Sequence, residues 1–129
     1  MKYLLDAHTL LWFVAGATDL PSSVRSLIED PLNQRFVSIA TLWEIAIKVN
    51  LGKLTMAVTF GELAPKYLFE NDMAVLPITV AHLQEVVQLP FHHRDPFDRL
   101  LIAQSIVDDM PVLSRDRLFD AYPVKRLWA

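Results

Sequence analysis

Four acidic residues in separate parts of the chain have the type and spacing that metal chemistry requires. Each lies just after an apolar run or near the start of the helix that follows one: Asp6, Glu44, Asp98 and Asp116. If the runs are strands of one parallel sheet, the four carboxylates gather at a single edge. Carboxylates crowded in this way stay ionised only with cations among them. Hard oxygen ligands favour Mg²⁺ or Mn²⁺, ions that activate water and stabilise the leaving oxygen of a phosphodiester.

Three of these acids, considered singly, also suit the start of a helix. Asp6 is a good N-cap residue, and so is Asp116, although Ser114 competes for that second position. Asp95, followed by proline, fits the N-cap of the next helix, which puts Asp98 at the third helical position. The helix dipole favours an anion there. Structural roles are therefore real alternatives at these positions.

Glu44 has two structural alternatives of its own. The pattern Thr41-x-x-Glu44 is typical of a capping box, and Glu44 also lies one turn before Lys48, at the spacing of a helical ion pair. The rest of this helix is apolar on nearly every side, which indicates burial. A buried carboxylate needs a cation or strong donors. Metal ligation, the capping box and the ion pair all remain open for Glu44.

The elements that position these acids alternate along the whole chain. Strands are expected at 2–5, 35–39, 73–78, 112–113 and 124–127. Helices are expected at 9–14, 22–30, 41–51, 60–70, 79–89, 96–107 and 115–121. The strands lack clean polar–apolar alternation, as expected when both faces of a sheet are covered. This pattern predicts an α/β fold, a three-layer α/β/α sandwich with a mostly parallel central sheet, whose ligands bind at the carboxyl ends of the strands.

The composition is that of a globular protein. With 129 residues, of which 53% are hydrophobic and 21% charged, we expect one domain over 1–129. The absence of cysteine excludes disulfides, zinc thiolate sites and thiol nucleophiles. No signal peptide or membrane span is expected, which favours a cytoplasmic location without a membrane partner. The net charge of −3 comes from the four site acids, because setting them aside leaves a slight excess of positive charge.

The segments around the four acids resemble one family in order and spacing over essentially the whole chain. LLDAHTLLW, SIATLWEIAIKVNLGKL, HHRDPFDRLLIAQ and LSRDRLF are similar to the motifs of PIN domains, specifically of the VapC-type toxin ribonucleases of type II toxin–antitoxin systems. HRDPFDRLLIAQ is the most specific match. The resemblance implies a Mg²⁺-dependent endoribonuclease that cleaves RNA, with Mn²⁺ as a plausible substitute. It also implies a cognate antitoxin that blocks the site, and a homodimer.

By position, the resemblance implies that Asp6, Glu44 and Asp98 are the core metal-binding acids and that Asp116 is the fourth, more variable one. It gives Thr9 as the hydroxyl of the first motif, and Ser114 stands where many members have threonine. Further residues are expected to support the site or to touch the substrate: Asp95, Arg94, Arg99 and Arg115. The three arginines either hold RNA phosphates or pair with the acids.

Other residues and functions compete less well with this hypothesis. His92 and His93 are expected on a solvated loop, because adjacent histidines point apart. The large aromatic residues are interpreted as core or interface: Trp12, Trp43, Phe97 and Trp128. A phosphoryl-accepting Asp6 does not fit, since no second acid stands nearby as receiver or haloacid-type enzymes require. The alternative function is a non-catalytic PIN-like module that binds a partner.

Overall fold

Five parallel strands form the centre of the molecule in the computed structural model, which describes residues 1–129. The strands are β1 (Lys2–Leu5), β2 (Gln34–Ser38), β3 (Met73–Leu76), β4 (Val112–Leu113) and β5 (Arg126–Leu127). Their order in the sheet is β3-β2-β1-β4-β5, and every pair is parallel. The predicted α/β fold is confirmed, and the sheet is parallel throughout.

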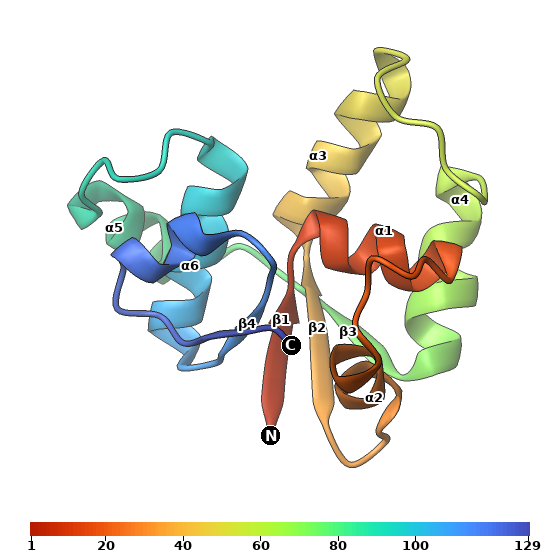
Figure 1. Cartoon of the computed structure of the whole chain (residues 1–129). Helices are drawn as coiled ribbons and strands as arrows, with labels where there is room; N and C mark the ends of the chain where they lie inside the picture. Colours follow the sequence, from red (N-terminus) through yellow and green to blue (C-terminus); the bar gives the residue numbers. More distant parts are fainter.

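Helices cover both faces of this sheet (Figure 1). They are α1 (Ala7–Ala15), α2 (Ser22–Glu29), α3 (Ile39–Asn50), α4 (Phe60–Glu62), α5 (Val80–Gln88) and α6 (Pro96–Asp108). Short helical turns complete the chain: a π-helix at Leu63–Leu68 and 3₁₀ turns at Phe69–Asn71 and Arg117–Ala121. Helices α1, α2 and α4 lie on one side of the strands, and α5 and α6 on the other. No helix has the length and apolar character needed to cross a membrane.

Two apolar cores hold the three layers together. Neighbouring residues of β1 point to opposite faces, so that Leu5 belongs to the core under α1, α2 and α3, while Leu4 belongs to the core under α6. Both are fully buried. Burial of one leucine side chain contributes about 2 kcal/mol. The strand between the two cores therefore holds the residue that follows it, Asp6, in a fixed place.

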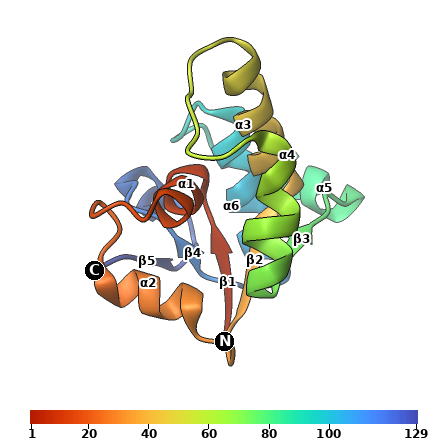
Figure 2. The same ribbon diagram turned by 90° about the vertical axis from the view of Figure 1, so that its right-hand side faces the viewer.

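The N-cap of helix α3 lies three residues earlier than expected. Ser38, the last residue of β2, is the N-cap and accepts a hydrogen bond from the Ala40 N–H at 3.0 Å. The predicted helix start at Thr41 is therefore wrong, and the capping box, one of the alternatives for Glu44, does not form, because Thr41 and Glu44 lie inside the helix. The earlier start moves Glu44 into the second turn. Figure 2 shows α3 rising from the carboxyl ends of the strands, next to α1.

Candidate functional site

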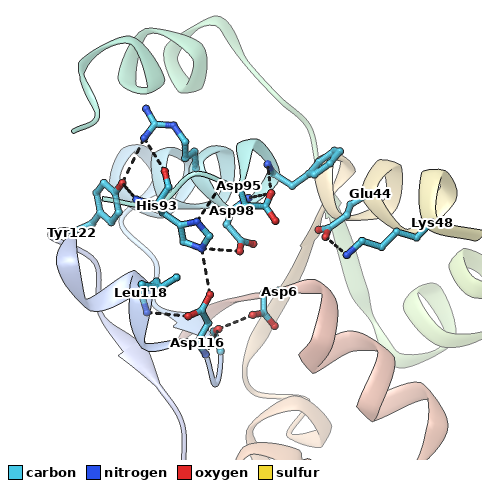
Figure 3. A network of polar contacts seen from close by, with 12 residues as sticks. Asp6, Glu44, Lys48, His93, Asp95, Asp98, Asp116, Leu118 and Tyr122 are labelled. Atoms are coloured by element: carbon cyan, nitrogen blue, oxygen red, sulfur yellow. Dashed lines mark hydrogen bonds and ion pairs between the residues drawn. The ribbon is translucent and has the colours of Figure 1, made fainter. Parts of the chain in front are cut away.

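The four predicted acids meet at the carboxyl edge of the sheet, each from a different segment (Figure 3). Asp6 directly follows β1, and Asp116 lies shortly after the end of β4. Glu44 comes from α3 and Asp98 from the first turn of α6. The carboxylates of all four turn toward one space in Figure 3. The parallel topology puts the ends of β1 and β4 and the start of α3 at one edge, and α6, which leads into the parallel strand β4, begins at the same edge.

Asp6 is fixed by two hydroxyls and one backbone group. Its Oδ1 accepts from the Thr9 N–H at 3.0 Å, and the Thr9 hydroxyl lies 2.7 Å from the same oxygen. The Ser114 hydroxyl donates to Oδ2 at 2.6 Å. Asp6 is thus both the N-cap of α1 and a carboxylate with a fixed orientation at the site. Both hydroxyls singled out from the sequence contact Asp6.

Asp98 is the most strongly perturbed acid of the site. Asp95 caps α6 by accepting from the backbone N–H groups of Phe97 and Asp98, as predicted. Burial raises the pKa of the Asp98 carboxyl to about 8, and four neighbouring like charges add to the effect. Those charges belong to Asp95, Asp6, Glu44 and Asp116. When no cation is present, the acids of the cluster therefore cannot all be ionised without strong mutual repulsion.

Glu44 makes the ion pair expected at helical spacing. Its Oε2 lies 2.8 Å from the Lys48 Nζ, and the carboxylate is buried. The hydrogen bond from Lys48 to Glu44 is the main reason that the pKa of Lys48 lies above its usual range, with Asp95 and Asp98 adding to it. Lys48 thus serves as a built-in counter-ion at this edge of the cluster. A cation bound among the acids competes with it for Glu44.

His93 is a site residue that sequence reasoning missed. Its ring is buried, with Nε2 lying 3.0 Å from Asp98 Oδ2 and 3.3 Å from Asp116 Oδ2. The Asp95 N–H donates to Nδ1 at 3.2 Å, so Nδ1 bears no proton. The hydrogen-bond pattern assigns the neutral ring as the Nε2–H tautomer. His93 therefore donates toward two acids that come from opposite sides of the site.

Tyr122 and Arg99 hold the loop before α6 in place and bury His93 within it. The Tyr122 hydroxyl accepts from the backbone N–H groups of His92 and His93 and donates to the Pro90 carbonyl at 2.7 Å. The Arg99 guanidinium donates to the carbonyls of Leu89, Pro90 and His93. The predicted solvated loop is therefore wrong for His93, which these contacts turn inward. His92 stays exposed.

The three arginines expected to touch substrate lie in different surroundings. Arg99 is buried, and its guanidinium packs 3.9 Å from the centre of the Phe91 ring while it binds the loop carbonyls. It holds the loop and does not face the acids. Arg94 and Arg115 are exposed, and neither forms an ion pair. Only these two are free to meet a phosphate group.

The acidic cluster is suited to bind a divalent cation. Asp98 and Asp116 bring carboxylate oxygens within 4.8 Å of each other and of His93 Nε2. Since the assigned tautomer directs a proton rather than a lone pair into the site, His93 is a donor to the ligands and not itself a ligand. The remaining donors are carboxylate oxygens, the ligands that Mg²⁺ and Mn²⁺ prefer.

A family model for the PIN domain matches residues 3–125. This chain belongs to the PIN domain family. PIN domains are generally nucleases, and these enzymes typically use divalent metal. No curated protein matches the sequence closely enough to add to this.

Solved structures share the PIN fold at low sequence identity. VapBC2 from Rickettsia felis, bound to a promoter DNA fragment, has a TM-score of 0.73 at 13% identity, with 100% of both chains covered. FitAB bound to an IR36 DNA fragment has a TM-score of 0.69 at 17% identity, covering 97% of this chain and 93% of that chain. FitAcB from Neisseria gonorrhoeae has a TM-score of 0.66 at 15% identity, with 97% and 96% covered. At such identities the likeness shows the fold.

Proposed function

We propose that this PIN domain is a metal-dependent endoribonuclease that hydrolyses RNA phosphodiester bonds. The observation that supports this best is the convergence of four carboxylates on one sheet edge, with the pKa of Asp98 raised to about 8. We assign the metal-binding role to Asp6, Glu44, Asp98 and Asp116, with Mg²⁺ as the ion and Mn²⁺ as a substitute. When bound, such an ion activates water for attack and neutralises charge on the phosphate.

The residues of the chain supply orientation for this chemistry. Thr9 and Ser114 fix the two oxygens of Asp6, and His93 holds the carboxylates of Asp98 and Asp116 in register. Asp95 stabilises the start of α6 and so the place of Asp98. No side chain of the site need act as a nucleophile, because an in-line attack by water only requires that the phosphate be held against the acids.

We further propose that the chain is the toxin of a type II toxin–antitoxin pair, inhibited by its antitoxin. VapBC2 and FitAB are toxin–antitoxin complexes, which supports this assignment. A cleft of about 420 Å³ between α1, α3 and the loop after α3 adjoins Glu44 and Lys48 and has a mostly hydrophobic lining. We call it the apolar cleft. A segment of the antitoxin bound there would reach the acids; co-purification with the product of a neighbouring gene tests this.

A homodimer is proposed on a different surface. Along α5, three apolar side chains at helical spacing are exposed: Val80 at 71%, Leu83 at 50% and Val87 at 86%. Such a stripe is unusual on a monomer and suits a self-complementary interface. Sedimentation velocity of the chain, with Leu83→Glu as the disrupting variant, measures whether the stripe pairs. A wild-type chain that stays monomeric at all concentrations rules the homodimer out.

Replacing Asp6 by asparagine tests the proposed activity directly. Asp6→Asn keeps the size of the side chain and the acceptor for Thr9, so the fold should survive with a loss of about 1 kcal/mol. We expect the rate of Mg²⁺-dependent RNA cleavage to fall by more than about 100-fold, because a ligand charge is lost. Gel analysis of RNA incubated with the chain, with and without chelator, measures this rate.

The matched control is Glu29→Gln, which removes one exposed acid at the end of α2, far from the site. It should cleave RNA at the wild-type rate. Undiminished cleavage by Asp6→Asn contradicts the mechanism. Absence of Mg²⁺ and Mn²⁺ binding in calorimetry, together with absence of cleavage by the wild type, favours the non-catalytic module instead.

His93 variants test whether one donor organises the two acids. In His93→Gln the side-chain amide can still donate near the position of Nε2, whereas His93→Ala has no donor. We expect His93→Ala to lose about 10- to 100-fold in Mn²⁺ affinity or activity, the usual cost of removing a group that orients a metal ligand, and His93→Gln to lose much less.

NMR of the metal-free chain tests whether His93 orients Asp98 and Asp116 by hydrogen bonding or only packs against them. Nitrogen NMR of the His93 ring should show the Nε2–H tautomer, with a proton on Nε2 and none on Nδ1. A proton on Nδ1 overturns the proposed role, and so do equal losses in the two variants.

A further inference from the structure

Two adjoining clefts lie beside Asp6 and Asp116. The first, of about 390 Å³, is lined by Asp6, His8, Trp12, Arg115, Asp116 and Arg117. The second, of about 540 Å³, is lined by Arg115, Arg117, Arg126, Trp128 and Ala129. Because Arg115 and Arg117 line both, the clefts join into one trough. We call it the arginine trough; it begins at the acids Asp6 and Asp116 and extends to Trp128.

The trough has two arginines without an acidic partner. Arg115 and Arg117 are exposed, and neither forms an ion pair or a side-chain hydrogen bond. Arg126, by contrast, pairs with Asp120 at 2.9 Å and donates to the Ser114 carbonyl at 3.1 Å. The Asp116 carboxylate lines the same cleft, and its two oxygens are engaged by His93 and the Leu118 N–H. The trough therefore presents two unpaired guanidinium groups directly beside the acids Asp6 and Asp116.

Aromatic rings lie next to these charges. The Trp12 ring centre lies 5.6 Å from that of His8 and 6.0 Å from that of Trp128. The Arg115 guanidinium carbon lies 6.0 Å from the centre of the Trp12 ring. Trp12 and Trp128 pack partly against the core, as expected from the sequence, yet both also line the trough. A positively charged groove with adjacent aromatic rings is what binds single-stranded nucleic acid, through phosphates and stacked bases.

We propose that the arginine trough binds a single-stranded arm of the RNA substrate on one side of the cleaved phosphate. Arg115 and Arg117 contact backbone phosphates, and the indoles of Trp12 and Trp128 stack with bases. This inference rests on the proposed ribonuclease function and adds the direction in which the strand leaves the site. The apolar cleft next to Glu44 shares His8 and Trp12 with the trough, but its walls are mostly hydrophobic and its Lys48 is already paired with Glu44.

Salt-dependent binding of RNA tests the arginines. The background is Asp98→Asn, so that RNA is not cleaved, and the probe is a short unstructured fluorescent RNA followed by anisotropy. In Arg115→Ala and Arg117→Ala, the slope of log affinity against log salt should become shallower by about 0.7 for each phosphate that the variant no longer binds. Lys66→Ala, which removes an exposed cation after α4, on the other side of the molecule from the C-terminal strand, should leave the slope unchanged.

Loss of base stacking should lower the affinity for RNA without changing the dependence of that affinity on salt. Trp128→Leu keeps an apolar side chain for the core and should weaken RNA binding about tenfold at constant salt slope. If the two arginine variants bind RNA with the affinity and slope of the background, the trough is not the RNA site. The same holds if they lose only binding of the antitoxin, which assigns the trough to that protein. Cleavage of RNA by the wild type in either case leaves the ribonuclease function intact; a wild type that neither binds nor cleaves RNA overturns both.

Discussion

Asp98→Asn is expected to abolish RNA cleavage and, at the same time, to make the metal-free chain more stable at neutral and alkaline pH. The loss of activity follows from the loss of one metal-binding charge. The gain in stability follows from the pKa of Asp98, which burial and the neighbouring acids raise to about 8 in the folded state. The asparagine amide still accepts the hydrogen bond from His93 but cannot ionise. Activity and stability should therefore change in opposite directions.

The sign of the pH dependence follows from proton binding in the two states. An unfolded aspartic acid releases its proton near pH 4, whereas folded Asp98 keeps it up to about pH 8. Folding therefore becomes less favourable as the pH rises through this window, and above pH 8 the full cost of the buried charge is present. Four pH units at about 1.4 kcal/mol each set a ceiling of about 6 kcal/mol. Relaxation of the neighbouring acids lowers this ceiling. We expect the free energy of unfolding of Asp98→Asn to exceed that of the wild type by about 2–3 kcal/mol at pH 8.

Urea unfolding in the presence of chelator measures the stability effect of this substitution. The difference in free energy of unfolding between Asp98→Asn and wild type should be near zero at pH 4 and should grow toward pH 8. Glu29→Gln, at an exposed position, should show no such growth. If Asp98→Asn is less stable than the wild type at pH 8, the ionised Asp98 carboxylate does not destabilise the fold.

The local signals in the sequence predict the fold and the convergence of the acids well because both depend on short-range chemistry. The Asp95-Pro96 pair predicts the start of α6, and the structure has Asp95 as the N-cap. The apolar strands predict a sheet covered on both faces, and Leu4 and Leu5 do enter opposite cores. Once a parallel sheet is granted, the meeting of Asp6 and Asp116 needs no further information.

Long-range contacts account for what the sequence could not predict. His93 faces the acids because Tyr122, 29 residues further along the chain, binds its backbone N–H. Arg99 is adjacent to Asp98 but turns to the carbonyls of the loop before α6, a choice that depends on where that loop folds back. The start of α3 differs from the prediction for another reason. Two hydroxyl residues, Ser38 and Thr41, offer caps three positions apart, and the end of β2 decides between them.

The site contains two internal substitutes for a metal ion. The proton on Asp98 neutralises one carboxylate, and Lys48 neutralises Glu44. Both must be displaced when a divalent cation binds, because their positive charges occupy the same cluster. The metal-free chain is thus kept folded at neutral pH by groups that weaken its affinity for metal. This competition should make the affinity for metal depend on pH.

The affinity for Mn²⁺ is expected to rise steeply with pH between about 6 and 8 and then to level off. In this range Asp98 holds a proton in the metal-free chain, so binding must release it, and each pH unit should tighten the dissociation constant by up to tenfold. Calorimetry in buffers of different ionisation enthalpy should detect about one proton released per chain at pH 7 and almost none at pH 9.

Two variants distinguish this linkage from a general loss of charge repulsion. Asp98→Asn, which has no proton to release, should bind Mn²⁺ weakly and without the steep dependence on pH. Lys48→Met removes the cation that pairs with Glu44, so it should bind Mn²⁺ more tightly than the wild type at every pH while keeping the slope. A wild-type affinity that stays constant between pH 6 and 8 contradicts the raised pKa of Asp98. If Asp98→Asn keeps the wild-type dependence on pH, the released proton comes from another group, because the asparagine side chain has none to give.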